Sequence, residues 1–179
     1  MDGTQFTVSS EPLYTGERIV VRMNRTRLPQ GPFVSTETVE HPDSVVIVAI
    51  DDHLNVLLVR QYRPAIGLVL VELPAGTIEQ GESPIACARR ELREETGFAA
   101  EEFKSIGGFW SAPGFCTEYL HAFLATNLYH DPLPADTDEQ IEAQWMKVTA
   151  AIEQAYSGGF YDAKTIAALT SASRLILGD

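Results

Sequence analysis

The first third of the chain carries the alternation of apolar and polar positions that is typical of β-strands. Apolar residues Ile19, Val21 and Met23 stand at every second position, and the segment PFVSTETVEH follows the turn-rich LPQGP, which predicts an N-terminal hairpin. The runs VVIVAI and VLLVRQY flank the turn DDHLN and predict a second hairpin. The segment GLVLVELPAG predicts a further strand that ends at Pro74.

The pattern then changes to the helical period, with clear signals at both ends. Ser83 is a good N-cap, Pro84 suits the first helical position, and Gly97 suits the left-handed residue beyond the last turn. These signals predict a helix over residues 84–96. The residues expected to pack on a sheet are Ile85, Leu92 and Thr96, with Cys87 as a small packing residue.

The remainder of the chain mixes strand and helix patterns. The predicted strands are FKSIGGFW, EYLHAFLAT and IEAQWMKV, and the segment AAIEQAYSGG predicts a short helix. A second amphipathic helix is expected over residues 162–177, and its expected buried residues are Ile166, Leu169, Leu175 and Ile176. We expect three large aromatic residues to fill the core: Trp110, Tyr119 and Trp145. Strands interrupted by a few helices predict a single mixed α/β (α+β) layered domain.

Composition and charge exclude several classes of protein. The 179 residues suffice for one domain with its own core, and the longest apolar runs are too short to cross a bilayer. A net charge of −12 argues against binding to duplex nucleic acid or to an anionic membrane. The N-terminus lacks the features of a secretory signal, and the two cysteines read as reduced thiols. We therefore expect a cytoplasmic protein without nucleic acid or membrane partners.

The predicted helix concentrates carboxylates on one side. At 100° per residue, Glu91, Glu94 and Glu95 project within about 100° of arc, where like charges repel. Because Arg90 and Arg93 are not spaced to neutralise all three, we expect cations to be the partners of these glutamates. Carboxylates without paired Cys or His favour a hard ion, Mg²⁺ or Mn²⁺, and Mg²⁺ commonly shares its coordination with substrate phosphates. A phosphate-containing substrate is the resulting hypothesis.

These residues belong to a longer motif. Gly76, Glu82 and the segment RELREETGF match every fixed position of the Nudix box, G-x5-E-x7-R-E-U-x-E-E-x-G-U, where U is a bulky apolar residue. The chain thus resembles the Nudix hydrolase family. The resemblance implies the Nudix fold, a mixed sheet between helices, over residues 44–179, with residues 1–43 as an N-terminal β-hairpin extension. It also implies hydrolysis of a nucleoside diphosphate linked to another group.

The resemblance assigns roles within and after the box. It makes Glu91 and Glu95 the main metal ligands, with Glu94 and the backbone carbonyl of Ala75 as additional ligands. Arg90 and Glu82 would support the geometry of the box. The water-activating base would lie on the later loop ADTDEQIEAQW, where Glu139 is the first choice and Glu142 the second, with Asp136 and Asp138 as competitors.

The segments that flank the box indicate which nucleoside diphosphate derivative is the substrate. LLVRQYRPAIG, ELPAG and SAPGFCTEYLHAF resemble the ADP-ribose pyrophosphatase branch, which forms AMP and ribose 5-phosphate. The resemblance implies that Arg63 contacts the pyrophosphate, that Glu118 and the backbone of Gly114 hold the terminal ribose, and that Glu37 contacts the adenosine end. Each side chain has a simpler alternative as an exposed surface or strand residue.

Two other functions stay open at this point. Hydrolases of other nucleoside diphosphate sugars, such as GDP-mannose, share much of the flanking pattern. A non-catalytic sensor of ADP-ribose is a third reading, although sensors usually carry a degraded box and a DNA-binding domain. The branch commonly forms homodimers in which the N-terminal strands cross to the partner, so we also expect a homodimer.

Overall fold

The computed structural model describes residues 6–134 and 140–178, which form two compact units. Of the described residues, the first unit comprises 6–43 and 110–119, and the second comprises 44–109, 120–134 and 140–178. The prediction of an N-terminal extension over residues 1–43 did not include residues 110–119, which pack with the N-terminal segment. That contact joins positions far apart along the chain, and periodicity carries no information about such contacts.

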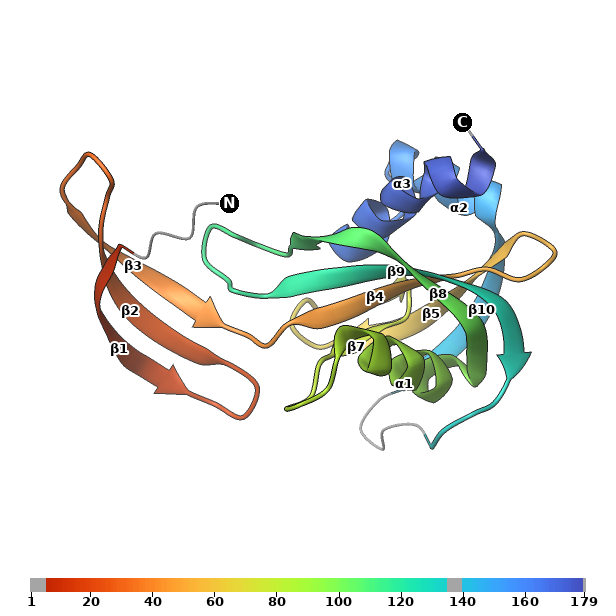
Figure 1. The fold of residues 1–179 in the computed structure, drawn as a ribbon, viewed down its shortest axis with the longest axis horizontal. Coiled ribbons are helices and arrows are strands. Elements are labelled where there is room, and N and C mark those ends of the chain that lie inside the picture. The colour runs from red at the N-terminus through yellow and green to blue at the C-terminus, as the bar shows by residue number, and fades with distance from the viewer. Residues whose placement is uncertain (1–5, 135–139, 179) are drawn as a thin grey trace. The chain divides into compact units, whose positions relative to one another are not determined.

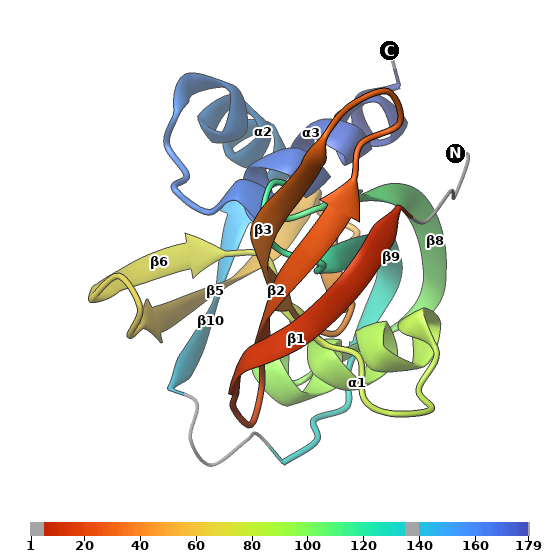
Figure 2. The same ribbon diagram turned by 90° about the vertical axis from the view of Figure 1, so that its left-hand side faces the viewer.

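The first unit is an antiparallel sheet in the order β1-β2-β3, formed by Thr7–Thr15, Val20–Arg27 and Phe33–Glu40 (Figure 2). β2 and β3 form the predicted hairpin, in register from the Val20–Glu40 pair to the Arg27–Phe33 pair. β1 was not predicted, because its polar residues lack a clear alternation. Residues 110–119 join this sheet through a parallel bridge between Val39 and Cys116.

The second unit contains a four-stranded sheet and a three-stranded sheet. The four-stranded sheet has the order β7-β4-β9-β8, formed by Ala75–Thr77, Ser44–Ala49, Tyr119–His130 and Phe98–Trp110. The three-stranded sheet has the order β10-β5-β6, formed by Ile141–Lys147, Asn55–Arg63 and Leu68–Glu72. The terminal residues of β8 and β9, Trp110 and Tyr119, belong to the first unit.

Helices cover both faces of the central strand β4 (Figure 1). Val45 and Ile47 pack in a cluster with the helix α1 (Pro84–Thr96), whereas Val46 and Val48 pack in a cluster with α2 (Val148–Ser157) and α3 (Ala163–Leu177). Every residue of β4 is buried, which explains its unbroken apolar run, since a strand covered on both faces needs no polar side. The mixed α/β class predicted from the sequence is confirmed.

Several packing expectations were wrong. Ile85 and Leu175 are 36% and 49% exposed, because they lie off the helix faces that contact the sheets. The buried residues of α1 are Cys87, Ala88 and Leu92, and Cys87 is the small packing residue that was expected. Trp110 and Trp145 are 47% and 42% exposed; each packs edge-on against one aromatic ring, of Tyr119 and Phe98 respectively.

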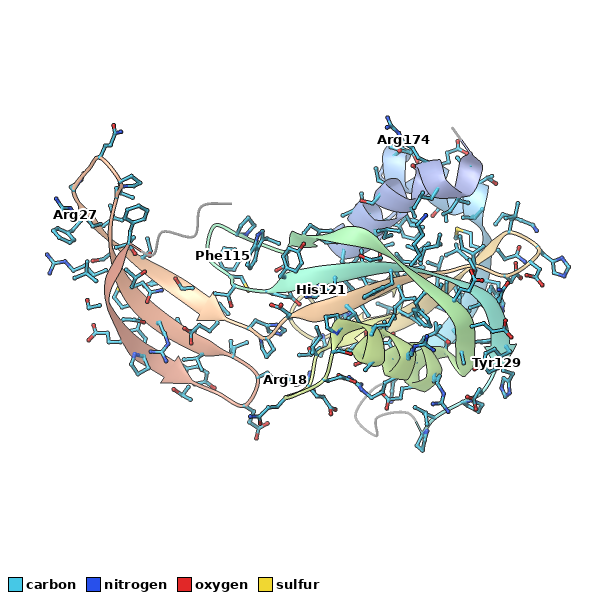
Figure 3. All side chains as sticks on the ribbon, viewed as in Figure 1. Arg18, Arg27, Phe115, His121, Tyr129 and Arg174 are labelled. Carbon is cyan, nitrogen blue, oxygen red and sulfur yellow. The ribbon has the colours of Figure 1, made fainter. Side chains whose placement is uncertain are left out.

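The C-terminal helix α3 shows the same division between a buried and an exposed side. Its buried residues include Ala168, Leu169 and Ala172, whereas Arg174 in its last turn points away from the sheets (Figure 3). None of the helices within the described residues is long and apolar enough to cross a bilayer.

Candidate functional site

The helix α1 begins and ends where the sequence predicted. The Ser83 hydroxyl accepts a hydrogen bond from the Ala86 amide at 3.3 Å, and Pro84 occupies the first turn. Gly97 has φ 77° and donates its amide to the carbonyl of Arg93. These caps satisfy backbone groups that a helix leaves unpaired at its ends, and they fix which turn carries the glutamates.

Arg90 lies at the centre of the acidic side of α1. Its Nη1 donates to Glu91 at 2.7 Å and to Glu94 at 2.9 Å, while Nε and Nη2 each donate to the Glu82 carboxylate at 3.0 Å. The hydrogen bonds from Arg90 hold the pKa of Glu82 below its ordinary value. In turn, the hydrogen bonds that Arg90 makes to Glu82, Glu94 and Glu91 raise the pKa of Arg90. Two of the three glutamates, Glu91 and Glu94, are therefore paired with Arg90. The sequence had predicted metal cations as their partners.

The strand β7 lies directly against this acidic side. The Ala75 amide donates to the Glu95 carboxylate at 3.0 Å. At Gly76 a Cβ atom would overlap the carboxylate of Glu91, so a larger residue at this position would displace that carboxylate. The first glycine of the box thus brings the backbone of β7 to the glutamates of α1.

Hard oxygen donors make up the set of residues that could hold a metal ion. Glu91, Glu94 and Glu95 offer carboxylates beside the backbone of Ala75, which suits Mg²⁺ or Mn²⁺. The nearby thiol of Cys87 is a poor ligand, because burial raises its pKa and keeps it protonated. Within residues 6–134 and 140–178, no three acidic, His or Cys side chains converge as a metal-binding group, and Arg90 engages Glu91 and Glu94. The donor chemistry fits the ion, and Arg90 competes with it for two carboxylates.

Arg63, the predicted pyrophosphate ligand, is neither a free ligand nor a simple surface residue. Its Nε and Nη2 donate to the two oxygens of Glu72 at 2.8 and 2.6 Å. The hydrogen bond to Glu72 raises the pKa of Arg63, and the negative charge of Glu95 contributes to the same shift. Of the box residues, the charge of Glu95 thus acts on Arg63.

The sequence did not predict the partner of this arginine, Glu72, or the lysine that shares Glu72 with it. Glu72 is 1% exposed and also contacts Lys164 at the start of α3, which in turn pairs with Asp162 at 3.0 Å. Burial opposes the ionisation of Glu72, but hydrogen bonds from Arg63 and Lys164 outweigh it and lower its pKa. A signal was present in the sequence: Glu72 ends the apolar run GLVLVE, where a charged residue needs a partner.

The other predicted ligands of substrate lie in the first unit. Glu37 is exposed on β3 opposite Met23 of β2, and a Cβ atom at Gly114 would meet no neighbouring atom within 4 Å. The Glu118 carboxylate lies 3.7 Å from the ring of His41, whose backbone amide donates to Thr117 at 3.0 Å. Their roles toward substrate stay predictions.

The candidates for the water-activating base lie in the segment after β9 and on β10. Glu139, like Asp136 and Asp138, lies outside the described residues. Glu142 is on β10 opposite Arg60, with its side chain 76% exposed and 3.5 Å from that arginine. An exposed pair at this distance leaves the carboxylate accessible to water.

Comparisons with known proteins identify the family of this chain. Residues 40–169 match the NUDIX domain. The chain is 35% identical to an ADP-ribose pyrophosphatase of Bacillus subtilis, covering 91% of this chain and 89% of that protein. It is 36% identical to an ADP-ribose pyrophosphatase of Mycobacterium tuberculosis, covering 96% and 84% of the two chains.

Two further similarities are more limited. A GDP-mannose pyrophosphatase of Salmonella paratyphi B is 37% identical over 63% of each chain. The crystal structure of an ADP compounds hydrolase superposes with a TM-score of 0.85 over 98% of this chain and 95% of that one, at 22% identity, which supports the fold alone. Together with the box on β7 and α1, the domain match shows that the chain belongs to the Nudix family.

Proposed function

We propose that this chain is a Nudix pyrophosphohydrolase that cleaves the pyrophosphate of ADP-ribose to AMP and ribose 5-phosphate with Mg²⁺. The observation that carries the proposal is the set of box glutamates held against β7, in a chain whose relatives over most of its length are named ADP-ribose pyrophosphatases. A dianionic pyrophosphate could not approach three glutamates unaided. The substrate therefore calls for added positive charge at this place.

The residues that would hold the metal ion are Glu91, Glu94, Glu95 and the carbonyl of Ala75. When bound, Mg²⁺ supplies positive charge that neutralises the pyrophosphate and makes its phosphorus more electrophilic. Mn²⁺ offers the same hard-ion chemistry. Arg63 adds a guanidinium, which can donate two hydrogen bonds to neighbouring phosphate oxygens. The carboxylates hold the cation, and the guanidinium orients the substrate.

A base must take a proton from the attacking water. We assign this step to Glu139, with Glu142 as the second candidate, because both lie on the acidic segment that follows β9 and a carboxylate can act as a general base. Glu37, Gly114 and Glu118 are proposed to hold the adenosine and ribose ends of the substrate.

Another nucleoside diphosphate sugar is the alternative substrate. The Salmonella relative named GDP-mannose pyrophosphatase favours this alternative, although it aligns with a smaller part of the chain. A non-catalytic ADP-ribose sensor is less favoured, because the box glutamates and glycines are complete. We also propose that the protein acts in the cytoplasm as a homodimer.

A substrate panel tests the proposal. Purified protein is incubated with Mg²⁺ and ADP-ribose, GDP-mannose or NADH, and kcat/KM is measured for each. We expect the highest value for ADP-ribose. A higher value for GDP-mannose would transfer the assignment to the alternative, and binding of ADP-ribose without turnover would favour the sensor.

A further inference from the structure

A buried carboxylate joins three elements of the second unit beside the box. Glu72, at the end of β6, receives two hydrogen bonds from Arg63 of β5 and an ion pair from Lys164 of α3. The exposed fractions of the side chains are 1% for Glu72, 15% for Lys164 and 37% for Arg63. A buried carboxylate is stable only with such partners, and here it has two cations instead of one.

The start of α3 holds Lys164 and the end of β6 in place. The Asp162 carboxylate caps α3 by accepting from the amide of Thr165 at 3.0 Å, and it pairs with Lys164. The Thr165 hydroxyl in turn accepts from the amide of Leu73 at 2.8 Å. Residues 72 and 73 are therefore anchored to α3, only two residues before Ala75 contacts Glu95.

The guanidinium of Arg63 is held along one edge. Glu72 engages Nε and Nη2, whereas Nη1 has no hydrogen-bond partner among residues 6–134 and 140–178. The side chain is partly exposed, so this remaining edge can meet a ligand. A guanidinium fixed on one side loses less conformational entropy when its other side binds an anion.

We propose that Glu72 and Lys164 form a positioning pair that holds Arg63 ready to bind the pyrophosphate oxygens of the substrate, an inference that rests on the proposed function of Arg63. Glu72 sets the orientation of the guanidinium. Lys164 shares the charge of Glu72, so that Arg63 is not fully neutralised by its own partner. The alternative is that the cluster only stabilises the fold.

A double-mutant cycle separates positioning from stabilisation. We expect Arg63→Met to lower kcat/KM for ADP-ribose by about 10- to 100-fold, the range for hydrogen bonds to charged groups. Lys164→Met should lower it about 10-fold in the wild type but by no more than about 2-fold when Arg63 is already Met, because the pair then has nothing to position. Lys164→Arg should keep most of the activity, and Lys104→Met, the same substitution at an exposed site of β8, should have no effect.

A second variant guards against misfolding. Glu72→Gln is nearly isosteric and is expected to follow the same cycle, with thermal unfolding recorded for every variant. An equal loss from Lys164→Met or Glu72→Gln in the presence and absence of Arg63 would overturn the inference. A fall in the unfolding temperature with no change in kcat/KM would overturn it as well, and would mark the cluster as structural.

The failure of the proposed function is distinguishable from failure of the inference. The same cycle is run by calorimetry with inorganic pyrophosphate and Mg²⁺, which needs no turnover of ADP-ribose. A wild type that binds pyrophosphate but does not cleave ADP-ribose would contradict the proposed function only. Non-additive losses of pyrophosphate affinity in the cycle would still support the positioning pair, and additive losses would reject it.

Discussion

Glu95 and Arg90 lie on the same helix but make hydrogen bonds to different parts of the box. Glu95 accepts a hydrogen bond from the backbone of Ala75, whereas Arg90 gathers Glu82, Glu91 and Glu94 around one guanidinium. A charged network of this kind holds carboxylates at defined positions. The acidic side of α1 is thus ordered by arginine in this structure, and a metal ion must displace part of that pairing.

Substitution of glutamate by glutamine separates metal binding from water activation. Glu95→Gln should weaken Mg²⁺ binding and lower kcat by at least about 10- to 100-fold, the range seen for residues that merely support metal ligands. Glu139→Gln should lower kcat similarly while leaving Mg²⁺ affinity unchanged, because a base need not touch the ion. Calorimetry with Mg²⁺ and steady-state kinetics check both.

Glu101→Gln is the matched control, since Glu101 is exposed and lies just beyond the box. Glu101→Gln should leave the Mg²⁺ affinity and kcat unchanged. Wild-type turnover in Glu139→Gln would reject that residue as the base, and unchanged Mg²⁺ affinity in Glu95→Gln would remove it from the ligand set.

At the residue level, the sequence identified candidate residues but not their partners in the fold. Arg63 was identified as a candidate ligand, but nothing local indicated that Lys164 shares its carboxylate partner from about 100 positions away along the chain. Arg90 was assigned to support the box, yet its pairing with Glu94 at four residues' separation was overlooked. The pair of Lys164 and Glu72 depends on the fold, which a local pattern cannot supply, whereas the pair of Arg90 and Glu94 follows from helical spacing alone.

Among the elements, α1 illustrates what local signals can and cannot predict. The Ser83 hydroxyl and the Gly97 amide cap its ends by hydrogen bonds and Pro84 has the φ that the first turn needs, so its bounds followed from the sequence. Its buried face depends on how the helix is rotated against β4. Helical spacing placed Ile85 on the expected buried face with Leu92 and Thr96, whereas in the structure Cys87 and Ala88 are buried beside Leu92.

Two truncations test the packing of this element. Leu92→Ala should lower the free energy of unfolding by about 2–5 kcal/mol, because Leu92 is fully buried between α1 and β4 and its truncation leaves a cavity. Ile85→Ala should lower it by less than about 1 kcal/mol, since Ile85 is partly exposed. Urea unfolding followed by circular dichroism measures both, and equal losses would contradict the assigned rotation of α1.

For the whole molecule, the sequence predicted the mixed fold and its family but not the composition of the first unit. The unit includes residues 110–119 and the strand β1, all nine residues of which are exposed. Val8, Leu13 and Tyr14 on β1 are 63%, 53% and 60% exposed, and apolar side chains in such number favour a partner. This surface is consistent with the proposed homodimer.

Light scattering coupled to size-exclusion chromatography tests the oligomeric state. We expect a mass of twice that of one chain at the concentrations used for activity assays. Val8→Lys should shift the population toward the single chain, because a charge placed on an apolar contact surface is costly to bury. Ser10→Lys on the same strand is the control for charge alone, and a monomeric wild type would contradict the proposal.

The central claim is that this acidic chain cleaves the pyrophosphate of ADP-ribose with the help of a divalent cation. The most direct measurement is chromatographic identification of the products from ADP-ribose with Mg²⁺ and with excess EDTA. We expect AMP and ribose 5-phosphate in equal amounts with Mg²⁺ and no product with EDTA. Release of ADP and ribose, or a rate that EDTA does not change, would contradict it.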